Sequence, residues 1–350
     1  MATMSLRLDH PVWRSARALL WITAVSLIAF QAGADTLETV RSRGTLLCGV
    51  NEGLPGFSMS DAKGEWSGLD VDLCRAIAAA TIGDATAVTF IPLTARDRFP
   101  ALRAGEVDVL VRNTTWTLAR DSRLAVDFVG VNYYDGQAFM TRAENGFKSV
   151  TDLGGARICV TRNTTTALNL TDYFRTRGMT FEPVTFVRSQ EMFPAYDAGL
   201  CDVVTADQSS LSANLPKLAR PGEHLILPEV ISKEPLGPAV KHGDNRWSDI
   251  VRWTLYAMIA AEEHGVTSKN AARVRAKTTR AEVRRLLGVE ESLGTMLGLP
   301  DDWAYQVLVQ VGNYGESFDR HLGAGSPIKL QRGMNAIWSE GGLMYAMPFR

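Results

Sequence analysis

Short apolar runs alternate along the chain with segments in which apolar side chains recur at helical spacing. Residues 46–50 and 156–160 form two such runs, each shortly after a glycine. Residues 69–81 and 169–177 carry apolar side chains three or four positions apart, as on one face of a helix. Strands that alternate with helices are typical of parallel sheets covered on both faces. The pattern therefore predicts an α/β fold.

An internal similarity divides the chain into two halves. Residues 101–110 (ALRAGEVDVL) resemble residues 195–204 (AYDAGLCDVV): a helix-compatible stretch ends at Ala-Gly, and an aspartate leads into a buried strand. The alternative is a chance match in a chain rich in alanine and glycine. Two diverged copies of one strand–helix–strand plan predict two lobes. Because ligands of open α/β sheets bind beyond the carboxyl ends of the strands, we expect a small-molecule site in a cleft between the lobes.

The N-terminal segment has the pattern of an export signal. Arg7, Arg14 and Arg17 precede an apolar run at 18–30, and Ala32-Gly33-Ala34 supplies small residues for cleavage after Ala34. The alternative is a membrane anchor, but a spanning helix needs about 20 apolar residues. We expect residues 1–34 to be a signal peptide and the mature chain, from Asp35, to be exported without a membrane span.

Charge and cysteine content narrow the classes of partner and cofactor. The formal net charge is −1, with 37 basic and 38 acidic residues spread along the chain, which argues against a nucleic-acid or anionic-membrane partner. The four cysteines, Cys48, Cys74, Cys159 and Cys201, allow three pairings in an oxidising compartment. They form no Cys-x-x-Cys motif, so disulfides are favoured over a zinc or redox site. We expect no metal and no cofactor.

Polar side chains follow the predicted strands where a ligand would bind. In the first half, Asn113-Thr114-Thr115 leads to Arg120, whose guanidinium matches a carboxylate. The alternative is an ordinary loop in which Arg120 pairs with a nearby aspartate. In the second half, Thr164, Thr165 and Thr166 precede a helix and fit either a plain N-cap or an anion site.

Asp207 ends the apolar run that begins at Val203. It fits either a cap of the next helix or a partner for an ammonium group. With Arg120 for a carboxylate and Asp207 for an amine, the pattern describes an α-amino acid. The chain has no Gly-x-Ser-x-Gly, no His-Glu-x-x-His and no P-loop motif, so hydrolase, metalloprotease and nucleotide-hydrolysing functions lack their signatures.

Several motifs along the chain match those of a known family. They are LLCGVNEGLPGFS at 46–58, GEWSGLDVD at 64–72, the run 112–120, NYYDG at 132–136, EPLGPAV at 234–240, GNYGE at 312–316 and GGLMYAMPFR at 341–350. With these motifs the chain resembles the polar amino-acid-binding proteins of bacterial ABC importers, within solute-binding protein family 3, and in particular their general L-amino-acid-binding subgroup. The resemblance covers nearly the whole mature chain.

The resemblance implies a role for each candidate residue. Arg120 would clamp the ligand carboxylate, with Thr115 and the Asn113 backbone beside it and further donors from Thr164, Thr165 and Thr166. Asp207 would take the α-amine. Asn51, Leu54 and Phe57 would form the first wall of the pocket. Members of the family often have glycine where this chain has Asn163, and an aromatic residue near Leu54.

The implied fold is a type II periplasmic-binding-protein arrangement: two α/β lobes, a two-strand hinge and a helical C-terminal extension. We expect residues 35–142 and 237–350 in the first lobe and its extension, and residues 143–236 in the second. Disulfides should stay within lobes, Cys48 with Cys74 and Cys159 with Cys201, because a bridge between lobes would resist hinge closure.

The expected function is that of a monomeric periplasmic protein that captures L-amino acids without altering them and delivers them to the permease subunits of an ABC transporter. One alternative is an exported enzyme on the same scaffold, such as a dehydratase of a small carboxylate, in which a catalytic group would replace the amine-binding acid. Another is a ligand-sensing subunit that acts through a separate receptor.

Overall fold

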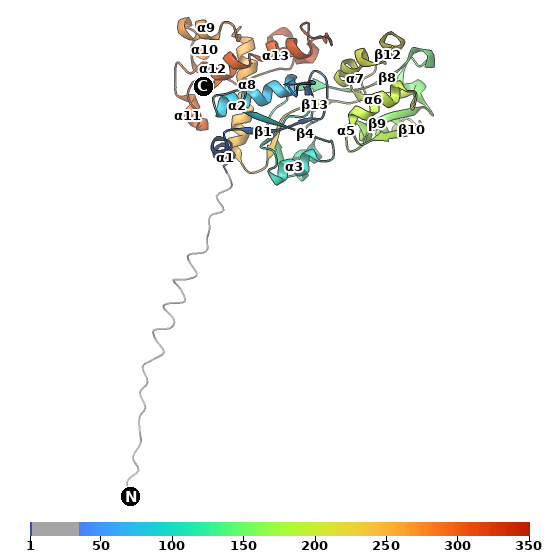
Figure 1. Ribbon diagram of the computed structural model, residues 1–350, viewed down its shortest axis with the longest axis horizontal. Helices are drawn as coiled ribbons and strands as arrows, with labels where there is room; N and C mark the ends of the chain where they lie inside the picture. Colours follow the sequence, from blue (N-terminus) through green and yellow to red (C-terminus); the bar gives the residue numbers. More distant parts are fainter. Residues whose placement is uncertain (2–34) are drawn as a thin grey trace. The chain divides into compact units, whose positions relative to one another are not determined.

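The computed structural model describes Met1 and residues 35–350, and residues 35–350 form one compact unit. The predicted export signal and its cleavage site fall at residues outside this range. Two five-stranded sheets lie apart in Figure 1, one among the blue, teal and orange elements and the other among the green and yellow ones. Among the described residues, none of the helices combines the length and apolar character needed to cross a membrane.

The first sheet combines a parallel centre with an antiparallel edge. β1 pairs in parallel with β4 and β5, whereas β14 pairs antiparallel with β5 and β6. β1 is buried along nearly its whole length, as expected for a central strand covered on both faces. In sheet order, the strands are β4 (Val88–Leu93), β1 (Leu46–Asn51), β5 (Val109–Leu110), β14 (Ala239–Lys241) and β6 (Val126–Phe128).

The second sheet repeats this plan. β9 pairs in parallel with β10 and β11, and β8 runs antiparallel to β11 and β12. The predicted repetition of a strand–helix–strand unit therefore corresponds to two sheets of the same type. In sheet order, the strands are β10 (Glu182–Phe186), β9 (Arg157–Thr161), β11 (Val203–Asp207), β8 (Gln137–Arg142) and β12 (His224–Ile226).

Two short antiparallel strands, β7 (Tyr133–Asp135) and β13 (Glu234–Leu236), carry the chain between the sheets. β8 belongs to the second sheet, so the chain crosses at β7, whereas the sequence placed the crossing near Ala143. The sheet to which β8 belongs depends on its pairing with residues distant in the sequence. A small hairpin of β2 (Met59–Ser60) and β3 (Trp66–Ser67) completes the strands.

Helices cover the sheets and form the C-terminal extension. The second sheet is covered by α5 (Thr165–Thr176), α6 (Ser189–Asp197) and α7 (Gln208–Asn214), the last followed by the short 3-10 helix η3 (Leu215–Lys217). The remaining helices are α1 (Thr36–Arg43), α2 (Leu69–Thr81), α3 (Arg98–Ala104), α4 (Leu118–Arg123), α8 (Asn245–Glu263), α9 (Ala271–Lys277), α10 (Ala281–Leu286), α11 (Leu293–Leu297), α12 (Trp303–Gln310) and α13 (Tyr314–His321).

The largest core forms where α2 packs against β1, α8 and α12. α2 is buried on almost every side, which its alanine-rich second half permits because small side chains allow close approach of its neighbours. Helix α8 also contacts the residue that precedes β5 in the first sheet: the indole Nε1 of Trp247 donates to the carbonyl of Asp108 at 2.8 Å. The C-terminal helices thus extend the core of the first lobe.

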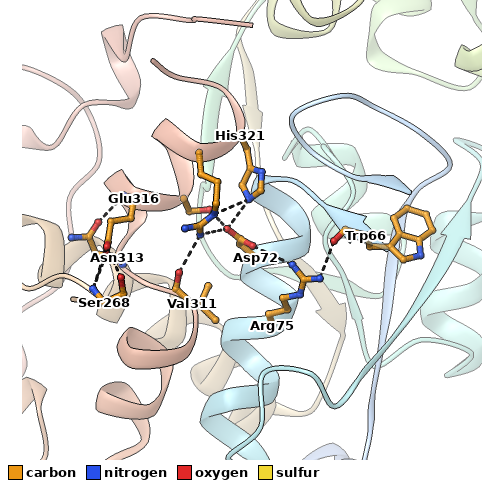
Figure 2. A network of polar contacts seen from close by, with 10 residues as sticks. Trp66, Asp72, Arg75, Ser268, Val311, Asn313, Glu316 and His321 are labelled. Atoms are coloured by element: carbon orange, nitrogen blue, oxygen red, sulfur yellow. Dashed lines mark hydrogen bonds and ion pairs between the residues drawn. The ribbon is translucent and has the colours of Figure 1, made fainter. Parts of the chain in front are cut away.

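A buried carboxylate in α2 joins this core to the C-terminal extension (Figure 2). Asp72 accepts hydrogen bonds from Ser317 Oγ at 2.8 Å, Arg320 Nη2 at 2.5 Å and His321 Nε2 at 2.9 Å. All three donors come from α13. Burial alone would raise the pKa of Asp72, but the hydrogen bonds and charges of His321 and Arg320 hold this pKa below its ordinary value.

Two disulfides fasten helices or loops to the central strands. Cys48 in β1 is bonded to Cys74 in α2, and Cys159 in β9 to Cys201 just before β11. These are the two pairs named from the sequence, and each lies within one lobe. Neither bond restricts a change in the angle between the lobes.

Candidate functional site

A small cavity of about 70 Å³, the inner cavity, lies between the two lobes at the carboxyl ends of the parallel strands. Both sheets contribute to it because β1 and β5 end on one side, and β9 and β11 on the other. The residues that line it are Asn51, Leu54, Ala95, Arg98, Arg112, Asn113, Thr115, Thr161, Thr164, Thr165, Thr166, Val187, Ser189, Met192, Thr205, Ala206, Asp207 and Ser210.

Eight of the ten binding residues named from the sequence line this cavity, and Phe57 and Arg120 do not appear in its lining. Phe57 is fully buried behind the wall, where its ring meets that of Tyr133 edge-on at 5.1 Å. Arg120 lies in α4; its Nη1 donates to the carbonyl of Thr115 at 2.8 Å, and its guanidinium stacks over Phe99. Arg120 therefore contacts the backbone of a lining residue.

Asp207 ends β11 and exposes 9% of its surface. Its side chain makes no capping hydrogen bond to α7, although it occupies the N-cap position. Burial raises the pKa of Asp207 well above its ordinary value, and the charges of Asp135 and Glu234 raise it further; Asn113 and Arg120 act in the opposite direction. A buried carboxylate that does not cap its helix is suited to a cationic ligand group.

Two buried arginines line the cavity and were missed by sequence reasoning. Arg98, the first residue of α3, exposes 3% of its surface, and Arg112, which follows β5, exposes 5%. Burial lowers the pKa of Arg112 to about 10 and that of Arg98 well below its ordinary value. Arg112 Nε donates to the carbonyl of Leu93 at 2.7 Å, whereas the buried Nε of Arg98 has no hydrogen-bond partner among the described residues.

The loop that carries Asn113 is held from behind by Asp70, in the first turn of α2. Asp70 accepts from the Asn113 backbone N–H at 2.8 Å and from Asn132 Nδ2 at 2.9 Å, and burial raises its pKa to about 6. Asn113 adopts a left-handed conformation with φ of 34°, and its side chain accepts from Asn51 Nδ2 at 2.9 Å. The two first-lobe loops are thus fixed to each other at the cavity.

The threonines of the second lobe cap a helix and line the cavity. Thr164 is the N-cap of α5: its hydroxyl accepts from the Ala167 N–H at 3.1 Å and donates to the Thr161 carbonyl at 2.7 Å. Thr164, Thr165 and Thr166 also line the cavity, so the positive end of the α5 dipole faces it. The preceding Asn163 has φ of 61°, a conformation that asparagine tolerates better than most residues, which explains how it replaces glycine.

Glu234 in β13 connects the lobes beside the cavity and was also missed as a functional residue. Its Oε2 accepts from Thr115 Oγ1 at 2.5 Å and Thr165 Oγ1 at 2.8 Å, and the two hydroxyl oxygens lie 3.2 Å apart. Its Oε1 accepts from Asn169 Nδ2 at 2.7 Å and Ser232 Oγ at 2.8 Å. The carboxylate, 1% exposed, therefore satisfies donors from both lobes at once.

A second contact between the lobes closes one side of the cleft. Gln190 Nε2 donates to the Glu52 carbonyl, and Arg188 Nε lies 3.3 Å from Glu52 Oε1. A Cβ on Gly53 would meet Gln190 Nε2 at 2.1 Å, so glycine permits this approach. The lobes are in the closed arrangement.

A larger cavity of about 440 Å³, the outer cavity, lies next to the inner one. Leu54, Ser189 and Ser210 line both, so the two spaces share a wall. The outer cavity is also lined by residues of both lobes. Its full lining is Gly53, Leu54, Met59, Ser189, Gln190, Phe193, Pro194, Asp197, Ser210, Asn214, Lys217 and Leu218.

Comparison with known proteins agrees with this architecture. Residues 46–269 match the family model described as "Bacterial extracellular solute-binding proteins, family 3". The chain is 50% identical to the glutamate/glutamine/aspartate/asparagine-binding protein BztA of Rhodobacter capsulatus, over 94% of this chain and 97% of that protein. It is also 50% identical to the general L-amino acid-binding periplasmic protein AapJ of Rhizobium johnstonii, over 95% of this chain and 98% of that protein.

A solved structure matches both lobes and the C-terminal extension. It is described as an ABC transporter periplasmic binding protein from Brucella ovis with glutathione bound. The chain shares 53% sequence identity with it, with a TM-score of 0.88, over 91% of this chain and all of that one. The expected type II periplasmic-binding-protein fold is confirmed. With its family model, relatives and fold in agreement, the chain belongs to the bacterial extracellular solute-binding proteins of family 3.

Proposed function

We propose that the chain captures L-α-amino acids in the inner cavity, in the periplasm, and delivers them as a monomer to the permease of an ABC transporter. The observation that carries this proposal is the pairing of an uncapped, buried Asp207 with buried guanidinium groups at one small cavity between lobes. A carboxylate and a guanidinium facing one space match the ammonium and carboxylate of a zwitterion. BztA and AapJ, which bind amino acids by name, support the same class of ligand.

Each ligand group has a proposed partner. The α-ammonium binds Asp207. Arg120 remains our candidate for the α-carboxylate, because within the described residues its guanidinium donates only to the Thr115 carbonyl and keeps further N–H groups for a ligand. Arg98 and Arg112 line the cavity and are additional candidates for the same carboxylate. Thr164, Thr165 and Thr166, at the N-terminus of α5, supply further donors.

Capture proceeds through closure about the strands β7 and β13. A ligand held by both lobes favours the closed form because its contacts with one lobe are lost on opening. In the closed form, Thr115 of the first lobe and Thr165 of the second donate to the same carboxylate, that of Glu234. The closed form is the one that we propose docks on the permease.

Two other functions were considered from the sequence. Members of the family are solute-binding proteins rather than enzymes, and Asp207 retains the acid expected for binding an amine. A dehydratase would instead have a catalytic group in place of this amine-binding acid. A sensing role through a separate receptor uses the same binding site and differs only in the partner of the closed form.

Isothermal titration calorimetry with the common L-amino acids tests the proposal, with D-enantiomers as controls. Asp207→Asn and Arg120→Met should each weaken binding by about 2 to 5 kcal/mol, because each leaves a ligand charge unpaired. Arg123→Met, an exposed position on the same short helix, is the matched control. If either site variant binds as tightly as the unmodified protein, that residue's assignment fails.

The solved relative adds a second candidate ligand. The Brucella ovis protein holds glutathione, a tripeptide whose glutamyl residue keeps a free α-amine and α-carboxylate. The outer cavity favours this candidate for our chain, because about 440 Å³ next to the inner cavity provides space for the rest of such a molecule. Titration with reduced glutathione, alongside glutamate and glutamine, distinguishes the two ligand classes.

A further inference from the structure

The two cavities differ in size and chemistry. The inner one, about 70 Å³, is lined by hydroxyls, two arginines and Asp207, whereas the outer one is about 440 Å³. Pockets for drug-sized ligands usually measure about 300–1,000 Å³, so the outer cavity has room for a ligand extension that the inner cavity lacks. A ligand that occupies both would pass beside the residues that line both cavities, Leu54, Ser189 and Ser210.

The outer cavity is amphipathic. Met59 of the first lobe and Phe193, Pro194 and Leu218 of the second provide apolar surface. Lys217, at the end of η3, is the one basic residue in the described lining. Within residues 35–350 no carboxylate lies at ion-pair distance from Lys217 or from the exposed Lys148, whereas Arg175 and Arg220 have acidic partners.

The acidic residue of the outer cavity is already engaged. Asp197 Oδ2 accepts from the Ala219 backbone N–H at 3.0 Å, which fixes the chain two residues after Lys217. Partial desolvation lowers the pKa of Lys217, although the residue remains exposed to solvent. Its ammonium group is therefore accessible to an incoming anion.

We propose that the outer cavity is a subsite for the extended side chain of an amino-acid ligand that ends in a carboxylate, with Lys217 as the partner of that carboxylate. This inference rests on the proposed function, since the inner cavity must hold the free α-ammonium and α-carboxylate. An ordinary α-linked peptide has lost one of these groups at every residue. The rest of the ligand must therefore be attached to the amino acid's side chain. γ-Glutamyl peptides have this linkage and are the proposed ligand class.

The probes are γ-glutamylglycine, its C-terminal amide, α-glutamylglycine and glutamine, each titrated by calorimetry at low salt. We expect γ-glutamylglycine to bind more tightly than its amide by about three- to five-fold, the range of a partly exposed ion pair. The α-linked isomer should bind far more weakly than the γ-linked one. High salt should reduce the preference for the acid, because ions screen the pair.

Lys217→Gln should remove the preference for the acid over the amide, and Lys217→Arg should retain it. Lys148→Gln is the matched control, an exposed lysine of the second lobe outside both cavities, and should retain the preference. Equal binding of acid and amide by the unmodified protein, or a preference that survives Lys217→Gln, overturns the subsite. Glutamine binding without γ-glutamylglycine binding also overturns it, whereas failure of every probe to bind overturns the proposed function itself.

Discussion

The hydroxyl oxygen of Thr115 lies 3.2 Å from that of Thr165, and both hydroxyls donate to one carboxylate oxygen of Glu234. Thr115 follows a strand of the first sheet, Thr165 begins a helix over the second, and Glu234 lies in a strand that connects them. The closed cleft therefore satisfies a buried charge that an open cleft would leave with fewer donors. Ligand contacts and this carboxylate favour the same arrangement of the lobes.

Glu234→Gln should weaken both ligand affinity and stability. The new amide would place an NH₂ group among four donors, and an unsatisfied buried polar group costs about 1–3 kcal/mol. We expect a loss of this size in unfolding free energy, measured by urea denaturation, and a fall in amino-acid affinity measured by calorimetry. Glu223→Gln, at an exposed pair with Arg220, should leave both unchanged. Unaltered affinity in Glu234→Gln would show that Glu234 does not contribute to closure.

Amino-acid affinity should depend on pH through Asp207. Burial raises the pKa of this carboxyl in the free protein, so it stays protonated to a higher pH than an ordinary aspartate. Because an ammonium group binds the ionised form, affinity should be complete above this pKa and fall as pH is lowered through it. Binding at mildly acidic pH should also release protons, which titrations in buffers of different ionisation enthalpy measure. Proton uptake, or tighter binding at lower pH, contradicts the role of Asp207.

The contacts of Asp72 should stabilise the C-terminal extension. Asp72→Asn removes the charge that pairs with His321 and Arg320, and we expect a loss of about 3 kcal/mol in unfolding free energy at pH 7, the low end for a buried pair because Arg320 is half-exposed. The folded-state pKa of Asp72 is lowered, so its contribution is present above its unfolded pKa and lost as pH falls through the folded one.

Urea unfolding at pH 7 and at progressively lower pH measures this contribution. Asp172→Asn provides the comparison, because Asp172 forms an exposed pair with Arg175 and should change stability by less than about 1 kcal/mol. The two variants should become similar in stability once Asp72 is protonated in the unmodified protein. If the unfolding free energies of the two variants differ by the same amount at all pH values, packing rather than charge explains the effect of Asp72→Asn.

Local sequence predicted several strands and helices and eight of the 18 residues that line the inner cavity, because hydrophobic spacing and residues at strand ends are local properties. It could not decide whether Asp207 caps α7, since that depends on where the side chain points. The role of Glu234 could not be predicted for a similar reason, because two of its partners, Thr115 and Thr165, lie 119 and 69 residues away in the sequence. The burial of Arg98 likewise depends on tertiary packing, which its local sequence does not reveal.

We expect the buried charge of Arg98 to lower the stability of the ligand-free protein and to raise its affinity for amino acids. Burial lowers its pKa, which means that the charged form is poorly solvated in the folded protein, and its Nε has no partner among the described residues. Holding a charged group in a poorly solvated interior costs free energy, and an apolar side chain of similar length avoids that cost. Arg98→Met should therefore keep or raise the unfolding free energy of the ligand-free protein.

The same substitution should lower amino-acid affinity, because it removes a cation that lines the inner cavity. Urea denaturation without ligand and calorimetry with ligand measure the two effects separately, and Arg96→Met, two residues away and exposed, should change neither. Opposite signs for stability and affinity identify Arg98 as a group retained for the ligand carboxylate. A destabilised Arg98→Met that still binds with full affinity would instead assign Arg98 a structural role and leave the carboxylate to Arg112 and Arg120.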